Sequence, residues 1–151
     1  MTVFAEASVH APPTTACHNV VAVVLQWRGK IAMLKRSNTV GHDRGRWHCI
    51  TGYLEPGASP REQALLELTE KTGLTGSDVL NLRPGPKLTL HDKSGANWTV
   101  HTFTAVTSNR RLSLDWEHES FKWTAPEKTA RYTNRVPWLD TVLVATGHLR
   151  G

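Results

Sequence analysis

One short segment, residues 59–73, constrains the fold of this chain more than any other. Ser59 stands where a helix N-cap belongs, Pro60 takes the first helical position, and Glu62, three residues after the serine, completes a capping box. Gly73 follows the last turn as a typical C-terminal stop. These signals predict a helix over residues 60–72, which follows the tight connection Glu55-Pro56-Gly57.

The predicted helix has two chemically different sides. Its apolar stripe, expected to face the core, consists of Ala64, Leu65 and Leu68. Residues three and four apart share a helix face, so Glu67, Glu70 and Lys71 gather on another side. An ordinary surface ion pair, worth about 0.3–0.5 kcal/mol, is one explanation of Glu67 and Lys71. The glycine-rich loop directly before the helix favours the other, a binding site beside the carboxylates.

Short apolar segments separated by turns make up most of the remaining chain. Runs rich in aliphatic, aromatic or Thr residues predict strands at residues 17–27, 31–35, 47–54, 87–91, 98–107, 112–114 and 121–124. The turn Arg28-Gly29-Lys30 predicts a hairpin between the first two, and residues 37–46 read as a loop. Helical spacing of apolar side chains predicts a terminal helix over residues 136–148. The order indicates an α+β fold, a mixed sheet between two helices.

The 151 residues are enough for one domain with its own core. Residues 1–15 are polar and read as a loose arm, which leaves residues 16–151 as a single domain. The start lacks a charged and then apolar signal, and no apolar run approaches the roughly 20 residues of a membrane span, so we expect a soluble, cytoplasmic protein. Cys17 and Cys49 are too few for a disulfide framework and are expected as buried thiols.

The formal net charge of +5 suits an anionic ligand such as a phosphate ester. Lys and Arg are scattered, however, and form no basic helix or stripe, which argues against a nucleic-acid polymer as partner. We therefore expect a small-molecule partner and no membrane. The sequence leaves a homodimer open.

Within residues 52–74, six positions fall on a known signature at the right spacing: Gly52, Glu67, Leu68, Glu70, Gly73 and Leu74. The segment resembles the Nudix box, which marks enzymes that cleave nucleoside diphosphates linked to another group. The early hairpin, the strand at Trp47 and the stretch from Glu119 to Trp123 before an Ala-Pro-Glu turn also look like this family. The resemblance implies a Nudix-like α/β/α sandwich.

The resemblance also implies Mg²⁺ or Mn²⁺, hard cations that take oxygen ligands and activate water beside a pyrophosphate. The metal ligands that it implies are Glu67, Glu70, Glu117 and the backbone at Gly52. The catalytic residues that it implies are Glu70 and Glu119, and Lys71 is a third candidate because its ammonium could take over part of the metal's role. Among the later candidates for a base or ligand, Glu119 is preferred, with Glu117 second and His118 third. A dinucleotide or an ADP-ribose-like compound is the first expected substrate, with a nucleoside monophosphate as product.

Three positions depart from the family pattern, namely Ala58, Leu66 and Lys71. Lys71 matters most, because an ammonium group offers only donors and repels a cation. Two unit charges about 4 Å apart, at an effective dielectric near 20, interact by about 4 kcal/mol. Three outcomes stay open: fewer metal ions than usual, a lysine that binds phosphate itself, or a nucleotide-binding module without catalysis. A Nudix-fold enzyme with other chemistry is a further alternative.

Residues near the predicted loops supply the expected substrate contacts. Trp47 and Trp116 adjoin loops and are the tryptophans expected to stack on a nucleobase, although a tryptophan more often packs in a core. Arg36, Arg44 and Arg46 precede the box strand and are expected to meet phosphates, which arginine binds bidentately; each is equally explained as a solvated side chain. The expected pocket wall also includes His48 and Tyr53.

Overall fold

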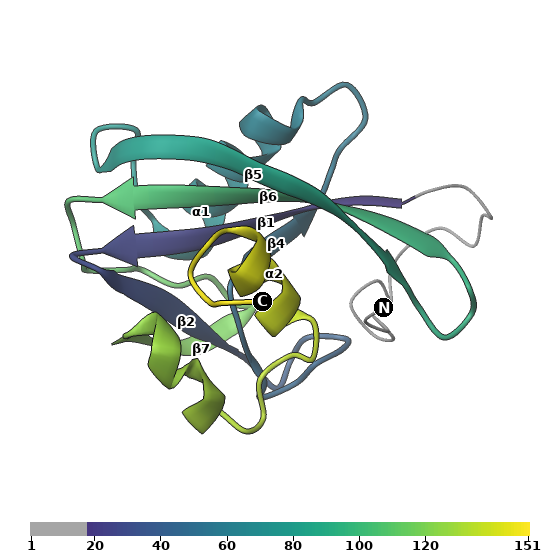
Figure 1. Cartoon of the computed structure of the whole chain (residues 1–151). Helices are drawn as coiled ribbons and strands as arrows, with labels where there is room; N and C mark the ends of the chain where they lie inside the picture. Colours follow the sequence, from purple (N-terminus) through teal and green to yellow (C-terminus); the bar gives the residue numbers. More distant parts are fainter. Residues whose placement is uncertain (1–17) are drawn as a thin grey trace.

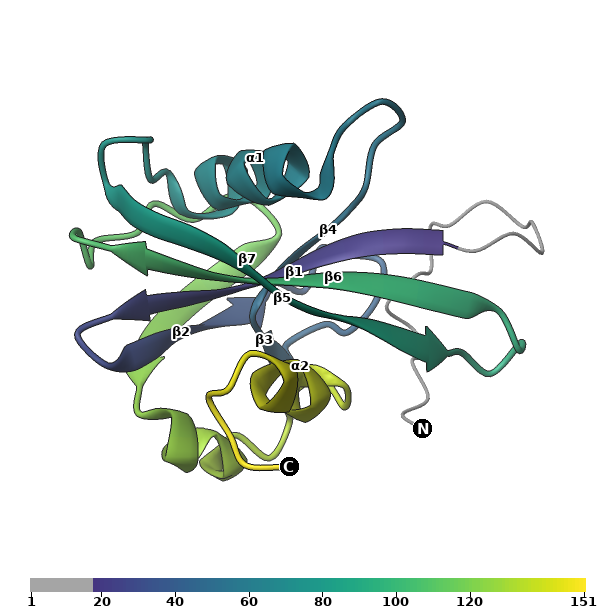
Figure 2. The same ribbon diagram turned by 45° about the horizontal axis from the view of Figure 1, so that its top comes forward.

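The computed structural model describes residues 18–151, which form a mixed sheet with a helix on each face. Figure 1 shows the strands and Figure 2 shows α1 and α2 on opposite sides of them. The strands are β1 (His18–Trp27), β2 (Lys30–Arg36), β3 (Trp47–His48), β4 (Ile50–Tyr53), β5 (Val79–His91), β6 (Asn97–Thr107) and β7 (His118–Thr124). The helices are α1 (Pro60–Thr72), the 3-10 helix η1 (Pro126–Arg131) and α2 (Leu139–Ala145). This arrangement confirms the α+β sandwich.

The sheet is organised around β1. Its path runs β3-β2-β1-β6-β5, with β4 added to β1 and β7 added to β2. The β1–β6 pair is parallel and the other pairs are antiparallel, so the sheet is mixed. The predicted hairpin at residues 28–30 is confirmed by the pairing of Gln26 with Ile31.

Alternation of side chains along β1 divides the interior into two cores. Because successive strand residues point to opposite faces, Val20, Ala22 and Val24 pack toward α2, whereas Val21, Val23 and Leu25 pack toward α1. Both faces of β1 are covered, which explains its nearly continuous aliphatic sequence.

Helix α1 begins and ends where the sequence predicts. The Ser59 side chain accepts a hydrogen bond from the Glu62 amide at 3.1 Å, and the Glu62 carboxylate accepts one from the Ser59 amide at 2.9 Å. Gly73 ends the helix at φ 72°, in the left-handed region that favours glycine. The predicted apolar stripe is partly wrong, because Leu65 is 37% exposed. Gln63 and Glu67 are buried instead.

Three strand predictions need correction. The segment predicted as one strand at 47–54 breaks at Cys49, since its first half pairs with β2 and its second half with β1. Residues 112–114 form no strand; Leu112 and Leu114 pack against the α1 core from an irregular segment. β5 starts at Val79, well before the predicted residue 87, because it follows β6 as a long edge strand.

The terminal helix is shorter than predicted. Before it, the Val136 amide donates to the Trp47 carbonyl at 2.8 Å and Arg135 bridges to Trp47, so this segment is tied to β3. Gly147, at φ 82°, follows the helix end. No helix within residues 18–151 is long and apolar enough to span a membrane. The predicted arm at residues 1–15 and the predicted Cys17 thiol lie outside the described residues; Cys49 is a buried free thiol.

Candidate active site

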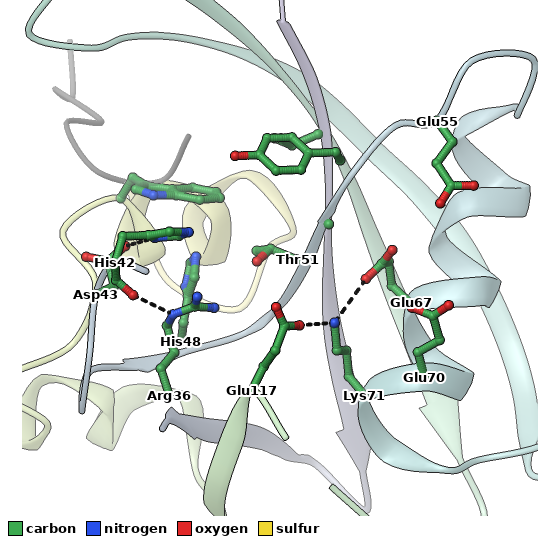
Figure 3. Close-up of a pocket in the computed structure, with 14 residues that line it drawn as sticks. Arg36, His42, Asp43, His48, Thr51, Glu55, Glu67, Glu70, Lys71 and Glu117 are labelled. Carbon is green, nitrogen blue, oxygen red and sulfur yellow. Dashed lines mark hydrogen bonds and ion pairs between the residues drawn. The ribbon is translucent and has the colours of Figure 1, made fainter. Parts of the chain in front are cut away.

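A cavity of about 390 Å³ opens between the end of β4, one side of α1, the loop after β2 and the segment before β7 (Figure 3). Its walls come from sequence segments far apart in the chain, which only the sheet brings together. The lining residues are Val20, Arg36, His42, Asp43, His48, Thr51, Gly52, Tyr53, Glu55, Glu67, Glu70, Lys71, Glu117 and Trp138.

Gly52 allows the α1 carboxylate to lie directly against β4. A Cβ atom at this position would stand 2.1 Å from the Glu67 carboxyl carbon, well inside any real contact. The glycine and the glutamate of the signature are therefore complementary in shape, which explains why they occur together. This close approach makes residue 67 part of the cavity wall.

Gln63 holds the Glu67 carboxylate in place from one helical turn earlier. Its side-chain amide donates to Glu67 Oε2 at 2.8 Å, and its carbonyl oxygen accepts from the Glu55 amide at 3.0 Å. Gln63 is 1% exposed and Glu67 6%. Burial raises the pKa of Glu67 to about 7, and the Gln63 hydrogen bond and the nearby Lys71 only partly oppose that effect. Glu67 thus titrates near neutral pH and would ionise fully beside a cation.

The Lys71 ammonium lies among three carboxylates. It donates to Glu117 Oε1 through a short contact and to Asp115 Oδ2 at 3.1 Å, and it lies 3.8 Å from Glu67 Oε1. Burial alone would lower the pKa of Lys71, but the hydrogen bonds to Glu117 and Asp115 outweigh it and raise the pKa above its usual value. Lys71 is therefore charged and paired, and it links α1 to the segment before β7.

Asp115 extends this network behind the cavity. Its second carboxylate oxygen lies 2.9 Å from Nδ1 of the buried His118. Burial would raise the pKa of Asp115, but the His118 hydrogen bond and the Lys71 ammonium lower it instead. The Ser113 amide also donates to the Thr72 carbonyl at 2.8 Å, so residues 113–117 are fixed along the end of α1.

The opposite wall carries imidazole, guanidinium and indole groups. Arg36 Nε donates to the His42 carbonyl at 3.2 Å, which directs the guanidinium into the cavity (Figure 3). Burial lowers the pKa of His48 to about 3, so its ring is neutral, and neither ring nitrogen has a hydrogen-bond partner among residues 18–151. The Trp138 ring meets it edge-on, with centroids 4.5 Å apart.

The charges of the lining residues favour a ligand that brings positive charge with it. Five carboxyl groups line the cavity, against two fixed cations; the carboxyl groups are those of Asp43, Glu55, Glu67, Glu70 and Glu117, and the cations are Arg36 and Lys71. No cluster of three His, Cys, Asp or Glu side chains within residues 18–151 is arranged to hold a metal ion.

Mg²⁺ commonly binds through only one or two carboxylates and shares its other positions with water and phosphate. Glu70 has no hydrogen-bond or ion-pair partner in the described part of the chain, and it lies next to Glu67 on the cavity wall. The donor set therefore fits one divalent ion at Glu67 and Glu70, shared with a ligand. It does not fit an ion at Glu117, which is paired with Lys71.

The structure brings most of the predicted carboxylates and Lys71 together, but not Glu119. Glu119 lies outside the cavity, with its carboxylate 3.9 Å from the Lys35 ammonium. The reason is a β-bulge: Lys35 pairs with Ser120 and Arg36 with His118, which leaves Glu119 as the extra residue. The bulge turns Glu119 away, so Glu117, the second choice, is the later carboxylate that reaches the cavity.

Among the predicted substrate contacts, only Arg36 lines the cavity. Arg44 instead donates to the Val40 carbonyl at 2.7 Å, and Arg46 lies 3.9 Å from Asp43. Trp47 packs edge-on against Tyr132, and Trp116 is 68% exposed on the outer surface. These four side chains therefore lie outside the cavity, and their expected contacts with a substrate stay a prediction. The expected wall residues His48 and Tyr53 do line the cavity.

Several cavity residues escaped the sequence analysis. Trp138 looked like a core residue of the terminal helix, yet it stands just before α2 and reaches the cavity. Asp43 lies in a polar loop and takes φ 52°, which no sequence signal marks. Gln63 does not line the cavity but supports Glu67 from one turn earlier on the same helix face.

A mixed sheet between two helices, with a carboxylate-lined cavity beside the capped helix α1, defines the class as an α+β sandwich. The sequence pattern of the NUDIX domain matches residues 17–143, and the chain belongs to this family.

Similar proteins agree with this assignment at modest identity. The chain is 25% identical over 114 residues to the CTP pyrophosphohydrolase of Escherichia coli, covering 75% of this chain and 79% of that protein. It is 33% identical over 132 residues to the octanoyltransferase of Myxococcus xanthus, covering 81% of this chain but only 34% of that longer protein. The NUDIX domain of Shewanella oneidensis NrtR, solved with ADP ribose, has a TM-score of 0.70 at 18% identity, covering 91% of this chain and 93% of that chain.

Proposed function

We propose that this protein is a pyrophosphohydrolase that cleaves the diphosphate of a nucleoside diphosphate linked to another moiety. The observation that carries the proposal is the convergence of the Glu70 carboxylate, the Lys71 ammonium and the Arg36 guanidinium on one cavity. The similar CTP pyrophosphohydrolase and the structural neighbour that holds ADP ribose support a phosphate-bearing nucleotide. A dinucleotide or an ADP-ribose-like compound is the first candidate substrate.

In the proposed reaction, Glu70 is the general base. Its carboxylate is unpaired in the described part of the chain and faces the cavity, so it can accept a proton from water. The water oxygen forms a bond to phosphorus, and the bond between that phosphorus and the bridging oxygen breaks. The bridging oxygen leaves with the second phosphate product, and the first product is a nucleoside monophosphate. Arg36 contributes a guanidinium that binds phosphate oxygens.

A divalent cation fits this proposal as a partner of the substrate. Glu67 and Glu70, with the backbone at Gly52, would hold Mg²⁺ or Mn²⁺, which neutralises phosphate charge and favours ionised water. Glu67 meets this role because its burial and its Gln63 hydrogen bond fix the carboxylate in one orientation. We assign Glu117 to Lys71 and not to the metal.

The opposite wall suits the uncharged part of the substrate. The His48 ring is neutral, so it offers one donor and one acceptor, and both ring nitrogens are without a partner among residues 18–151. Leaving such buried groups unpaired costs about 1–3 kcal/mol, a cost that a hydrogen-bonding ring would remove. Trp138 beside it adds aromatic surface. A nucleobase fits this combination.

A substrate screen tests the proposal. ADP-ribose, a dinucleoside polyphosphate and CTP are incubated with the protein, with and without Mg²⁺ or Mn²⁺, and nucleoside monophosphate is measured by chromatography. We expect turnover of at least one compound and a loss of about 100-fold or more in Glu70→Gln. The matched control is Glu127→Gln, an exposed carboxylate on η1 outside the cavity, which should keep full activity. Equal activity in both variants would rule out Glu70 as the base.

One observation favours a second candidate, a nucleotide-binding module without catalysis. Lys71 pairs with two carboxylates that could otherwise take part in metal chemistry. If no compound in the screen is cleaved, calorimetry with ADP-ribose separates the two functions. Binding without turnover supports the module. The absence of both binding and turnover would contradict both candidates.

A further inference from the structure

The Lys71 ammonium lies at the centre of a cluster of carboxylates. Three carboxylates surround its ammonium, those of Asp115 at 3.1 Å, Glu67 at 3.8 Å and Glu117 in short contact. Two of them come from the segment before β7 and one from α1 itself. The Lys71 side chain is only 12% exposed, so these ionic contacts are poorly screened by solvent.

The surrounding structure keeps this ammonium in place. Asp115 is fixed from behind by His118, whose Nδ1 lies 2.9 Å from the other carboxylate oxygen. Glu117 is held through its backbone, because its carbonyl accepts from the Ser37 amide at 2.8 Å. Ammonium groups act as compact point charges, and a second cation within a few ångströms of one is repelled.

We propose that the Lys71 ammonium is a built-in cation that takes the place of one divalent ion in this cavity. It neutralises Asp115 and Glu117 and closes their side of the cavity to Mg²⁺ and Mn²⁺. Metal binding is then confined to Glu70 and to Glu67, whose Oε1 lies 3.8 Å from the ammonium, farther than the two carboxylates that accept hydrogen bonds from Lys71. The inference rests on the proposed function, because both concern the positive charges, lysine and metal ion, in the same cavity. Its test measures metal binding and needs no turnover of a substrate.

A direct consequence concerns the segment that carries Asp115 and Glu117. Because Lys71 ties it to α1, the segment should keep its position whether or not a divalent ion is present. With divalent ions removed by a chelator, Lys71→Gln should therefore unfold at a lower temperature than wild type. Its unfolding temperature should also rise more on addition of Mn²⁺ than that of wild type, which binds Mn²⁺ only through Glu67 and Glu70.

The deciding experiment counts bound Mn²⁺ by electron paramagnetic resonance and calorimetry, with no nucleotide present. In Lys71→Gln the freed Asp115 and Glu117 should bind one additional ion, or bind Mn²⁺ at least about tenfold more tightly than wild type. The matched control is Lys128→Gln, which removes the same charge from an exposed site on η1. It should match wild type in both number and affinity. An unchanged number and affinity in Lys71→Gln would overturn the inference.

A second variant keeps the test valid if Lys71→Gln does not fold. With Lys71 retained, Glu117→Gln should leave the Mn²⁺ affinity unchanged within about twofold, because the Glu117 carboxylate is already paired with the Lys71 ammonium. A loss of tenfold or more would show that Glu117 binds metal directly and would contradict the inference. Absence of nucleotide hydrolysis would count against the proposed function alone, since neither Mn²⁺ measurement depends on catalysis.

Discussion

The two helices that cover the sheet bury very different side chains. α2 buries only aliphatic residues, namely Leu139, Val142 and Leu143. α1 buries Ala64 and Leu68 but also Gln63, Glu67 and Thr72. Burying a polar group costs free energy unless it is hydrogen-bonded, and α1 meets this condition through Gln63 and Glu67, which bond to each other.

This difference shows which helix serves stability alone and which also carries the site. Hydrophobic burial is enough to hold α2 on the sheet, so nothing there requires a polar residue. On α1, a carboxylate with a pKa near 7 lies buried against a glycine, an arrangement that lowers the stability of the empty protein. Such exceptions to simple core packing concentrate at functional sites. The predictions below test this contrast between the two helices.

The largest expected effect comes from truncating one leucine under each helix. Leu143→Ala and Leu68→Ala each remove a fully buried side chain and should lower the free energy of unfolding by about 2–5 kcal/mol. Only Leu68→Ala should also weaken Mn²⁺ binding, because Leu68 adjoins Glu67 on α1. Chemical denaturation and Mn²⁺ titration of both variants provide the measurement. Equal losses of Mn²⁺ affinity in the two variants would contradict the conclusion that only α1 carries the metal site.

Gly52→Ala should act next most strongly. The new methyl group would collide with the Glu67 carboxyl group, so the helix or the side chain must shift, at a cost of about 1–3 kcal/mol in the free energy of unfolding. Mn²⁺ affinity should fall with it. Gly76→Ala is the matched control, since no atom lies within 4 Å of a Cβ atom there. If both variants have the same free energy of unfolding and the same Mn²⁺ affinity, the close approach of β4 and α1 is not needed for stability or metal binding.

The pH dependence of stability should report the buried Glu67. The pKa of Glu67 is about 7 in the folded protein against an ordinary value of 4.5, so the folded state binds the proton more tightly. The stabilisation is complete below pH 4.5 and is lost as pH rises through 7, a decrease of about 3 kcal/mol. Glu67→Gln should lack this decrease. The measurement compares urea unfolding of both proteins between pH 5 and pH 8, and parallel curves would place the titration elsewhere.

The smallest expected effect is that of Leu65→Gln. Leu65 belongs to the stripe that the sequence assigned to the core, but the structure leaves it half-exposed on α1. The change should alter the free energy of unfolding by no more than about 0.5 kcal/mol. Thermal unfolding beside Leu68→Ala measures it, and a loss comparable to that of Leu68→Ala would show that Leu65 is buried in solution.

Local structure was predictable from the sequence where neighbouring residues alone determine the backbone conformation. The capping box at Ser59 and Glu62 and the left-handed Gly73 set both ends of α1 without help from the rest of the chain. The spacing of Glu67 and Glu70 likewise predicted one shared side of α1, because helix periodicity determines which side chains share a face, and both line the cavity.

Features that depend on distant pairing were not predictable. The bulge that turns Glu119 away exists only because β7 pairs with β2 out of register. Trp138 reaches the cavity because the segment before α2 is tied to Trp47. No local signal indicates that Trp47 and Trp116 face away from the cavity, since an aromatic residue beside a loop has no fixed direction until the sheet is assembled.

The amino-acid order by itself determined the capped helix, the two-sided burial of β1 and the residues of the Nudix signature, since these follow from local propensity and periodicity. Only the tertiary structure decided what surrounds Lys71. Its two hydrogen-bond partners, Asp115 and Glu117, lie more than 40 residues away in the sequence, and their approach depends on how β7 joins the sheet beside α1. Charge pairing across such distances is set by the packing of whole elements, which no local pattern encodes.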